Sequence, residues 1–259
     1  MSESKNRAVA VSMVLFLVGI IIALLPWFHK LWVNYMMHRD VQAFLSYVEV
    51  KPFVPGKRIP GETVPQESVA EEPALPTEHT QLWLDMQDYN QTISQEGQTG
   101  LSDPSAYEEA SFRLANYGLE SEVFGVLSIP RLELNMPIYL GATKQNMANG
   151  AAVMGQTSLP IGGSNTNCVL AGHRGWNGAA YFLYINQLEP GDIVTVTNLW
   201  ETLAYQVVDT QIISPNDVDA IHIQPGRELL TLLTCHPPAS GGKQRYLVFC
   251  ERIDNMEVS

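Results

Sequence analysis

The segments ELLTLLTC (228–235) and RYLVFCERI (245–253) are two apolar runs of strand length. The stretch between them, HPPASGGKQ (236–244), contains a Pro-Pro and a Gly-Gly pair, which are turn signals. Short apolar runs bounded by turn residues predict β-strands, so these segments are expected to form two successive strands. The rest of the fold is built outward from this pair.

Four more runs upstream have the same character. They are FGVLSI (124–129), NCVLAG (167–172), IVTVTN (193–198) and LAYQVVDTQII (203–213), the last two forming a hairpin around 198–201. Their spacing predicts an all-β barrel or sandwich of about 140 residues with short inserted helices, one of them near 178–184. Ahead of the strands, Leu82, Met86, Tyr89 and Ile93 recur at the spacing of an amphipathic helix.

The N-terminal region has the composition of a membrane anchor followed by a spacer. Residues 8–28 contain no formal charge and are long enough to cross the hydrocarbon core of a bilayer. A cleaved signal peptide is the alternative, but a Pro-Trp-Phe sequence follows instead of a small-x-small cleavage site. Six prolines and several glutamates between 51 and 80 predict an extended linker, and a proline-rich partner-binding tract is the alternative.

Charge and cysteine content exclude several functions. The chain has 259 residues and a net charge of −12, and residues 61–259 carry 8 basic against 24 acidic residues. So acidic a domain would repel phosphate backbones, and no nucleic-acid partner is expected. The three cysteines have neither a disulfide-framework nor a zinc spacing, and no metal or cofactor is expected.

Three predicted strand ends bring residues that can perform acyl transfer. His173 follows one strand, Cys235 ends another, and Arg245 opens the last. A cysteine nucleophile needs a nearby cation, histidine can supply one and protonate a leaving amine, and arginine can stabilise an oxyanion. The alternatives are a buried thiol for Cys235, a turn histidine for His173 and a solvated surface charge for Arg245.

The two-residue period of a strand separates the three cysteines. Cys168 points to the opposite face from His173, and Cys250 to the opposite face from Arg245. Cys168 and Cys250 are therefore expected to be small core residues. Asn167 and Thr234 are candidates for orienting a catalytic group, with a strand-end cap as the alternative.

At these positions the sequence resembles the sortase family of cell-surface transpeptidases of Gram-positive bacteria. The segment TLLTC (231–235) resembles the family's TLxTC signature, VLAGHRGWNGAAYF (169–182) the histidine segment, and RYLVFCER (245–252) the strand with the family arginine. The resemblance extends over about 121–253 and includes the TSLPIGG (157–163) and LEPGDIVTV (188–196) runs.

The resemblance implies a closed barrel of about eight strands and a set of catalytic roles. Cys235 would be the nucleophile, His173 the general acid and base, and Arg245 the group that stabilises the oxyanion or positions substrate. The reaction would cleave an LPxTG-like sorting signal between Thr and Gly and join it to an amine. The resemblance to the class C, pilus-assembling branch makes that amine a pilin lysine. The alternatives are a housekeeping sortase that attaches surface proteins to a cell-wall precursor, and a catalytically silent membrane-anchored adaptor.

Class C members carry a lid with an Asp-Pro-aromatic motif, and a related sequence occurs here. Asp103 and Pro104 match the motif, whereas Ser105 stands in the aromatic position. A lid is expected at 101–107, and an Asp-Pro turn before a helix over 106–115 is the alternative.

The whole chain is thus expected to have five parts. They are a cytoplasmic tail (1–7), a transmembrane helix (8–28), a juxtamembrane segment and linker (29–80), N-terminal helices with the lid (81–120) and a catalytic barrel (121–254). The expected location is the cell membrane, crossed once, with the barrel outside.

Overall fold

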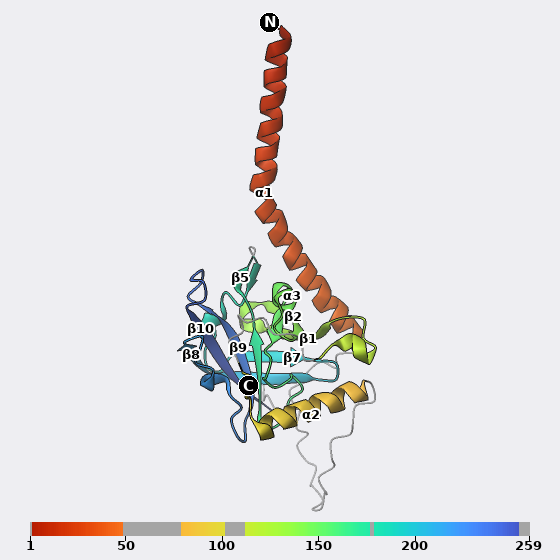
Figure 1. Ribbon diagram of the computed structural model, residues 1–259, viewed down its shortest axis with the longest axis vertical. Coiled ribbons are helices and arrows are strands. Elements are labelled where there is room, and N and C mark those ends of the chain that lie inside the picture. The colour runs from red at the N-terminus through yellow and green to blue at the C-terminus, as the bar shows by residue number, and fades with distance from the viewer. Residues whose placement is uncertain (1, 49–78, 102–111, 177–178, 254–259) are drawn as a thin grey trace, which may run out of the picture.

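The computed structural model of the chain describes residues 2–48, 79–101, 112–176 and 179–253. Eight strands close into a barrel in the order β1-β2-β3-β4-β9-β10-β8-β7 (Figure 1). Neighbouring strands are antiparallel except for the β2–β3 and β4–β9 pairs, which are parallel. The barrel strands are β1 (Val123–Ile129), β2 (Leu134–Leu140), β3 (Ala151–Val153), β4 (Thr166–Ala171), β7 (Ile193–Thr197), β8 (Thr202–Ile213), β9 (Glu228–His236) and β10 (Gln244–Arg252).

The closed barrel confirms the predicted fold class and decides between a barrel and a sandwich. Its interior is filled by a cluster to which all eight strands contribute buried apolar side chains. A second cluster covers the outer face of β4, β9 and β10, with Val169, Leu233 and Leu247 among its members. Both faces of these three strands are therefore buried, which explains why their sequences read as nearly continuous apolar runs.

Short elements connect the barrel strands. A separate two-stranded sheet is formed by β5 (Arg174–Trp176) and β6 (Ala179–Tyr181). The helices between strands are α3 (Lys144–Asn149) and the 3-10 turns η3 (Pro130–Leu132), η4 (Ile185–Gln187) and η5 (Asp219–Ile221), and a further 3-10 turn, η2 (Leu114–Tyr117), precedes β1.

The prediction of a helix near 178–184 was wrong. Residues 179–181 form β6, and its backbone pairs with β5 at Arg174↔Tyr181 and Trp176↔Ala179. Ala179 and Tyr181 are both buried while Ala180 between them is half-buried, which is the alternation of a strand. The helix of this region is the short turn η4, which follows.

The hairpin expected around 198–201 is confirmed and is held by one buried side chain. Asn198 Oδ1 accepts hydrogen bonds from the backbone N–H groups of Trp200 and Glu201, both at 2.9 Å. Its Nδ2 donates to the carbonyl of Pro160 at 3.0 Å. The asparagine therefore both shapes the turn and ties it to a neighbouring loop.

The predicted amphipathic helix is α2 (Thr80–Glu96), which crosses one end of the barrel (Figure 1). Leu82, Met86 and Ile93 are buried on the barrel side, as the spacing predicts. Asn90 lies on the same side and bonds both backbone groups of Leu159, at 3.2 and 2.7 Å. Its side chain thus locks the helix to the loop before β4.

The N-terminal helix α1 (Ser2–Tyr47) contains the predicted membrane segment and continues beyond it. The part from Ser12 onward is apolar enough to cross a membrane, with a hydropathy of 2.2 over its most apolar window, and none of that window is buried. Figure 1 shows the helix changing direction partway along, and its only proline is Pro26. The C-terminal part packs on the barrel, where Val41 and Phe44 are buried against β1 and β2. Residues 49–78, with most of the expected linker, lie outside the described residues.

Candidate active site

Cys235 and Arg245 lie opposite each other at one end of the β9–β10 pair. The two strands are antiparallel, so the next-to-last residue of β9 lies beside the second residue of β10. Cys235 is partly exposed, whereas the other two cysteines are buried. The buried-thiol alternative therefore does not describe Cys235.

Arg245 is 4% exposed and is not a solvated surface charge. Its Nη1 donates to the carbonyl of Gly242 at 2.7 Å, in the loop that joins β9 to β10, and to that of Gln244 at 3.1 Å, the first residue of β10. These bonds fix the orientation of the planar guanidinium, whose donors have a rigid fork geometry.

Gly242 lies against both the thiol and the guanidinium. A Cβ at this position would lie 3.0 Å from Nη1 of Arg245 and 3.5 Å from Sγ of Cys235. Its φ of +79° is in the region that favours glycine. Because Gly242 has no side chain, the backbone of this loop can lie close to both Cys235 and Arg245.

His173 is positioned by strand β4, which runs parallel to β9. The pairing continues past the end of β4, because the N–H of Gly172 donates to the carbonyl of Leu233 at 3.0 Å. Thr234 Oγ1 donates to the carbonyl of Gly172 at 2.7 Å and strengthens this junction. His173 therefore emerges beside the end of β9 that carries Cys235.

Two aromatic rings hold the imidazole of His173. The Trp176 ring stacks on it at 4.9 Å, and the Tyr181 ring meets it edge-on at 5.9 Å. The imidazole has no hydrogen-bond partner among the described residues. Burial lowers the pKa of His173, so that the neutral form is favoured. The β5–β6 hairpin thus keeps a neutral histidine at the site.

Strand parity separates the cysteines as predicted. Cys168 and Cys250 belong to the barrel interior, at 3% and 0% exposure, whereas the strands' other face carries His173, Cys235 and Arg245. Burial raises the pKa of both interior thiols well above the ordinary value, so neither forms a thiolate readily.

Arg174 is a residue at the site that sequence reasoning missed. It is 8% exposed, and its Nη1 lies 3.4 Å from the carbonyl oxygen of Cys235 and 3.0 Å from Nδ1 of His236. Its Nη2 donates to Asn186 Oδ1 at 2.7 Å, and its guanidinium lies 5.3 Å from the centre of the Tyr246 ring. Arg174 thereby ties β5 to the strand end that carries the thiol. The GHRG segment that supplies His173 was the available signal.

The other candidates have structural partners. Asn167 Nδ2 donates to the carbonyl of Ile221 at 2.9 Å, and its Oδ1 accepts from Thr231 Oγ1 at 2.8 Å. Together with the Thr234 bond to Gly172, these contacts join strands and loops instead of orienting a catalytic group. In the described part of the chain, no cluster of three or more His, Cys, Asp or Glu side chains is placed to hold a metal ion.

The predicted lid residues Asp103, Pro104 and Ser105 lie outside the described residues. The chain that leads to them is fixed: Gln98 donates to the carbonyl of Gln156 at 2.7 Å, and Leu101 packs on the outer cluster of the barrel. That cluster covers the same strand faces as the three candidate catalytic residues. The lid itself stays a prediction.

Comparison with known proteins identifies the family that shares this fold. A family model described as "Sortase domain" matches residues 127–253. Sortase A of Streptococcus agalactiae serotype III (strain NEM316) is 30% identical over 133 residues, which are 50% of this chain and 52% of that protein. Sortase D of Bacillus subtilis (strain 168) is 27% identical over 154 residues, covering 59% of this chain and 73% of that protein. The chain thus spans about half the length of the former.

Solved structures extend the similarity to the whole barrel. Sortase C1 of GBS Pilus Island 1 superposes with a TM-score of 0.67 at 27% identity, covering 86% of this chain and 95% of that one. Sortase C-1 from Actinomyces oris gives a TM-score of 0.61 at 31% identity, covering 69% of this chain and 99% of that one. The expected resemblance to class C sortases is confirmed.

Proposed function

Because the chain belongs to the sortase family, we propose that it is a cysteine transpeptidase that works through Cys235, His173 and Arg245. The observation that carries the proposal is the cross-strand pairing of Cys235 with Arg245, beside the strand end that positions His173. A nucleophile, a cation and a proton carrier then lie at one end of three adjacent strands. This is the set of groups that acyl transfer requires.

The proposed reaction has two steps. In the first, the neutral imidazole of His173 takes the proton of the Cys235 thiol, the resulting thiolate attacks the threonine carbonyl carbon of an LPxTG-like signal, and Arg245 stabilises the oxyanion. The C–N bond breaks, His173 gives its proton to the leaving amine, and a thioester forms on Cys235. In the second, an amine attacks the thioester, His173 takes the proton from the attacking nitrogen, and Cys235 leaves as the thiolate.

A pilin lysine is the proposed amine, which makes the reaction a step of pilus polymerisation. The support is the structural similarity to sortase C1 of GBS Pilus Island 1 and to the pilus-related sortase C of Group B Streptococcus. Attachment of surface proteins to an amine of a cell-wall precursor is the competing outcome of the experiment below.

The proposed location is the membrane, with residues 8–28 of α1 crossing it once and the barrel outside. The support is the exposed apolar side chains that α1 carries between Met13 and Phe28. A membrane-impermeant thiol reagent added to intact cells tests it, since Cys235 is the partly exposed cysteine. Labelling of wild type, lost in Cys235→Ala, is expected; labelling only after cell lysis contradicts an outside barrel.

The experiment that tests the activity uses the full chain in detergent with an LPxTG peptide and separate lysine and wall-precursor amines. Wild type is expected to form the thioester on Cys235, seen by mass spectrometry, and to transfer it to the lysine amine. Cys235→Ala is expected to abolish both products and leave the circular dichroism spectrum unchanged. Cys168→Ala is the matched control, because it removes a thiol from the barrel interior.

The outcomes separate the alternatives. Transfer to the wall-precursor amine alone contradicts pilus polymerisation and favours attachment of surface proteins to the cell wall. Absence of any thioester in folded wild type favours the silent adaptor. Activity that survives Cys235→Ala and disappears in Cys168→Ala overturns the assignment of the nucleophile.

A further inference from the structure

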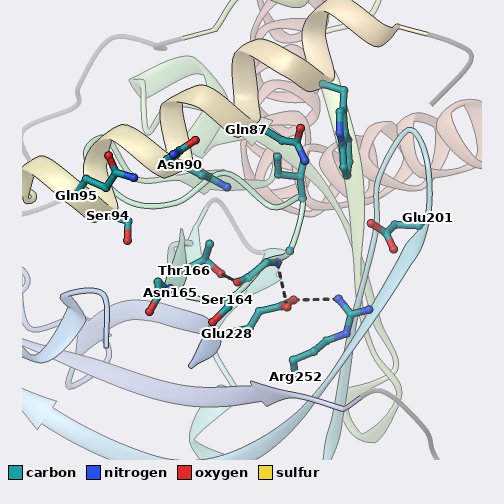
Figure 2. A pocket seen from close by; sticks show the side chains of 15 residues that line it. Gln87, Asn90, Ser94, Gln95, Ser164, Asn165, Thr166, Glu201, Glu228 and Arg252 are labelled. Carbon is teal, nitrogen blue, oxygen red and sulfur yellow. Dashed lines mark hydrogen bonds and ion pairs between the residues drawn. The ribbon is translucent and has the colours of Figure 1, made fainter. Parts of the chain in front are cut away.

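A cavity lies far from Cys235, between helix α2 and the opposite end of the catalytic strands (Figure 2). Its volume is about 690 Å³, within the range of small-molecule sites. Glu228 opens β9 at this cavity, and Cys235 follows seven residues later, which puts about 23 Å of extended strand between them. The catalytic mechanism proposed above does not use this cavity.

One wall of the cavity is a polar stripe on α2. Trp83, Gln87, Gln91 and Gln95 recur every four residues and therefore lie on one face of the helix. The stripe is about 18 Å long at the helical rise of 1.5 Å per residue. It is separate from the row of buried residues with which α2 packs on the barrel. The three glutamines are exposed, so each amide is available to a ligand.

The opposite wall is formed by residues 162–166 and the ends of β9 and β10, as Figure 2 shows. The carboxylate of Glu228 is already occupied by three protein donors. It accepts hydrogen bonds from Arg252 Nη1 at 2.9 Å, Tyr205 OH at 3.1 Å and the N–H of Gly163 at 3.0 Å. The ion pair cancels the charge of Arg252. The wall is therefore rigid and locally neutral.

The groups left for a ligand are mainly amides and hydroxyls. Six polar side chains in the cavity have no hydrogen-bond partner within the described part of the chain: Gln87, Gln91, Ser94, Gln95, Ser164 and Glu201. Amides and hydroxyls both donate and accept, so they complement a ligand that carries hydroxyl and amide groups of its own. Of these six side chains only Glu201 carries a carboxylate, which disfavours an anion, as does the acidic charge of the domain.

The indole of Trp83 adds a flat apolar surface at one end of the stripe. Its ring is fixed by an edge contact with Trp200, at 4.8 Å and 78°. A rigid aromatic ring beside amides suits the apolar face of a sugar ring and its polar rim. A peptide would instead need a free strand edge or apolar side-chain pockets. Here Thr166 is already paired with Glu228, and the aliphatic lining residue, Ile161, is 5% exposed.

We propose that this cavity, defined by the α2 stripe and residues 162–166, binds a neutral N-acetylated saccharide. The acetamido group pairs with the glutamine amides, the hydroxyls pair with Ser94, Ser164 and Glu201, and a sugar ring lies on Trp83. This binding site goes beyond the proposed transpeptidase activity.

The probe is tri-N-acetylglucosamine, titrated into the full chain in detergent by calorimetry and tryptophan fluorescence. Saturable binding is expected, with a Kd at least tenfold weaker in the Gln87→Ala/Gln91→Ala double variant, because two ligand hydrogen bonds are lost. Thr92→Ala is the matched control and should leave Kd unchanged, since Thr92 is exposed on the same helix outside the cavity. Maltotriose, which lacks the acetamido group, should bind more weakly.

Three outcomes overturn the proposal. They are no saturable binding up to about 10 mM, which is weaker than any useful site; binding that the double variant leaves unchanged; and preferential binding of a Ser/Asn-rich peptide, which would make the cavity a peptide site. Cys235→Ala should bind the saccharide as wild type does. Failure of the saccharide proposal is therefore distinct from failure of the transpeptidase proposal.

Discussion

At the scale of single residues, the site depends on how closely backbone approaches reactive side chains. Gly242 contacts both members of the Cys235–Arg245 pair, and its neighbour Gly241 shares its backbone geometry without that contact. Gly242 and Gly241 have φ of +79° and +71°. Substituting each in turn therefore separates the effect of a clash with the catalytic pair from the effect of backbone strain alone.

Gly242→Ala is expected to lower kcat/KM at least tenfold. The added methyl would lie 3.0 Å from Nη1 of Arg245, so the guanidinium has to move, whereas the same change at Gly241 meets nothing within 4 Å. Both substitutions place a side chain at a positive φ, which lowers the free energy of unfolding by a similar amount, about 1 kcal/mol. Peptide transfer assays and thermal unfolding of both variants check this. Equal losses of activity in the two would show that strain alone matters.

Arg245→Lys is expected to reduce the rate by ~10²–10³ although the charge is kept, since an ammonium cannot reproduce the directional donors of the guanidinium. Arg227→Lys is the control, because Arg227 makes a two-point contact with Glu251, at 3.0 and 2.8 Å, away from the cysteine. Single-turnover formation of the thioester is the measurement. A loss below about tenfold would give Arg245 a substrate-positioning role instead.

At the scale of elements, the β5–β6 hairpin controls the environment of His173. Its Trp176 ring is stacked on the imidazole, while Trp176 as a whole remains 47% exposed. The hairpin therefore acts as a partial cover that keeps water from one face of the histidine.

Trp176→Ala is expected to raise the pKa of His173 toward its ordinary value, because burial is the cause that lowers it. In wild type the folded state resists protonation of His173, so stability is lost as pH falls below the ordinary imidazole pKa. The variant should lose less stability over that interval. Histidine NMR titration between about pH 5 and 8 measures the shift. Tyr184→Ala, at an exposed ring without contact to His173, should leave it unchanged.

Strands were predictable where an apolar run was long, and the barrel follows from them. The strands that sequence reasoning missed are short or atypical: β3, β5 and β6 have three residues each, and β2 contains Pro137. Three-residue strands rich in alanine carry almost no periodic signal. Whether they form a strand is decided by the strand with which they pair. Strand ends were sufficient to locate Cys235 and Arg245.

Residues that reach the site through tertiary contacts were not predictable. Arg174 gains its role because the β5–β6 hairpin folds it back onto the carbonyl of Cys235. The amide stripe of α2 is visible as a four-residue repeat, but exposed glutamines on a helix are ordinarily a solvated face. Only the loop at 162–166 on the other side makes it a wall of a cavity.

At the scale of the whole molecule, α1 is part of the folded domain as well as a candidate membrane segment. Phe44 is 5% exposed, buried with Val41 against β1 and β2. Tyr139 OH also reaches Asp40 Oδ2, at 3.5 Å. The helix is thus attached to the barrel by packing in addition to the chain itself.

Phe44→Ala is expected to lower the free energy of unfolding of the detergent-solubilised chain by about 3 kcal/mol, as for other buried phenylalanines. Tyr35→Ala, at a residue 63% exposed on the same helix, should change it by less than about 0.5 kcal/mol. Urea unfolding measures both. A Phe44→Ala effect as small as that expected for Tyr35→Ala would mean that the docked end of α1 contributes nothing to the stability of the barrel.

Because α1 is one helix from the candidate membrane segment to the barrel, it limits how the barrel can meet a partner. Val41, which touches the barrel, lies thirteen residues beyond position 28, or about 20 Å along the helix. With residues 8–28 in a bilayer, as proposed, the barrel is held at one height and cannot swing outward on a slack tether. A partner that is itself held in the membrane is then found by lateral diffusion within a thin layer, where confinement raises the effective concentration. A partner released into bulk solution loses that gain.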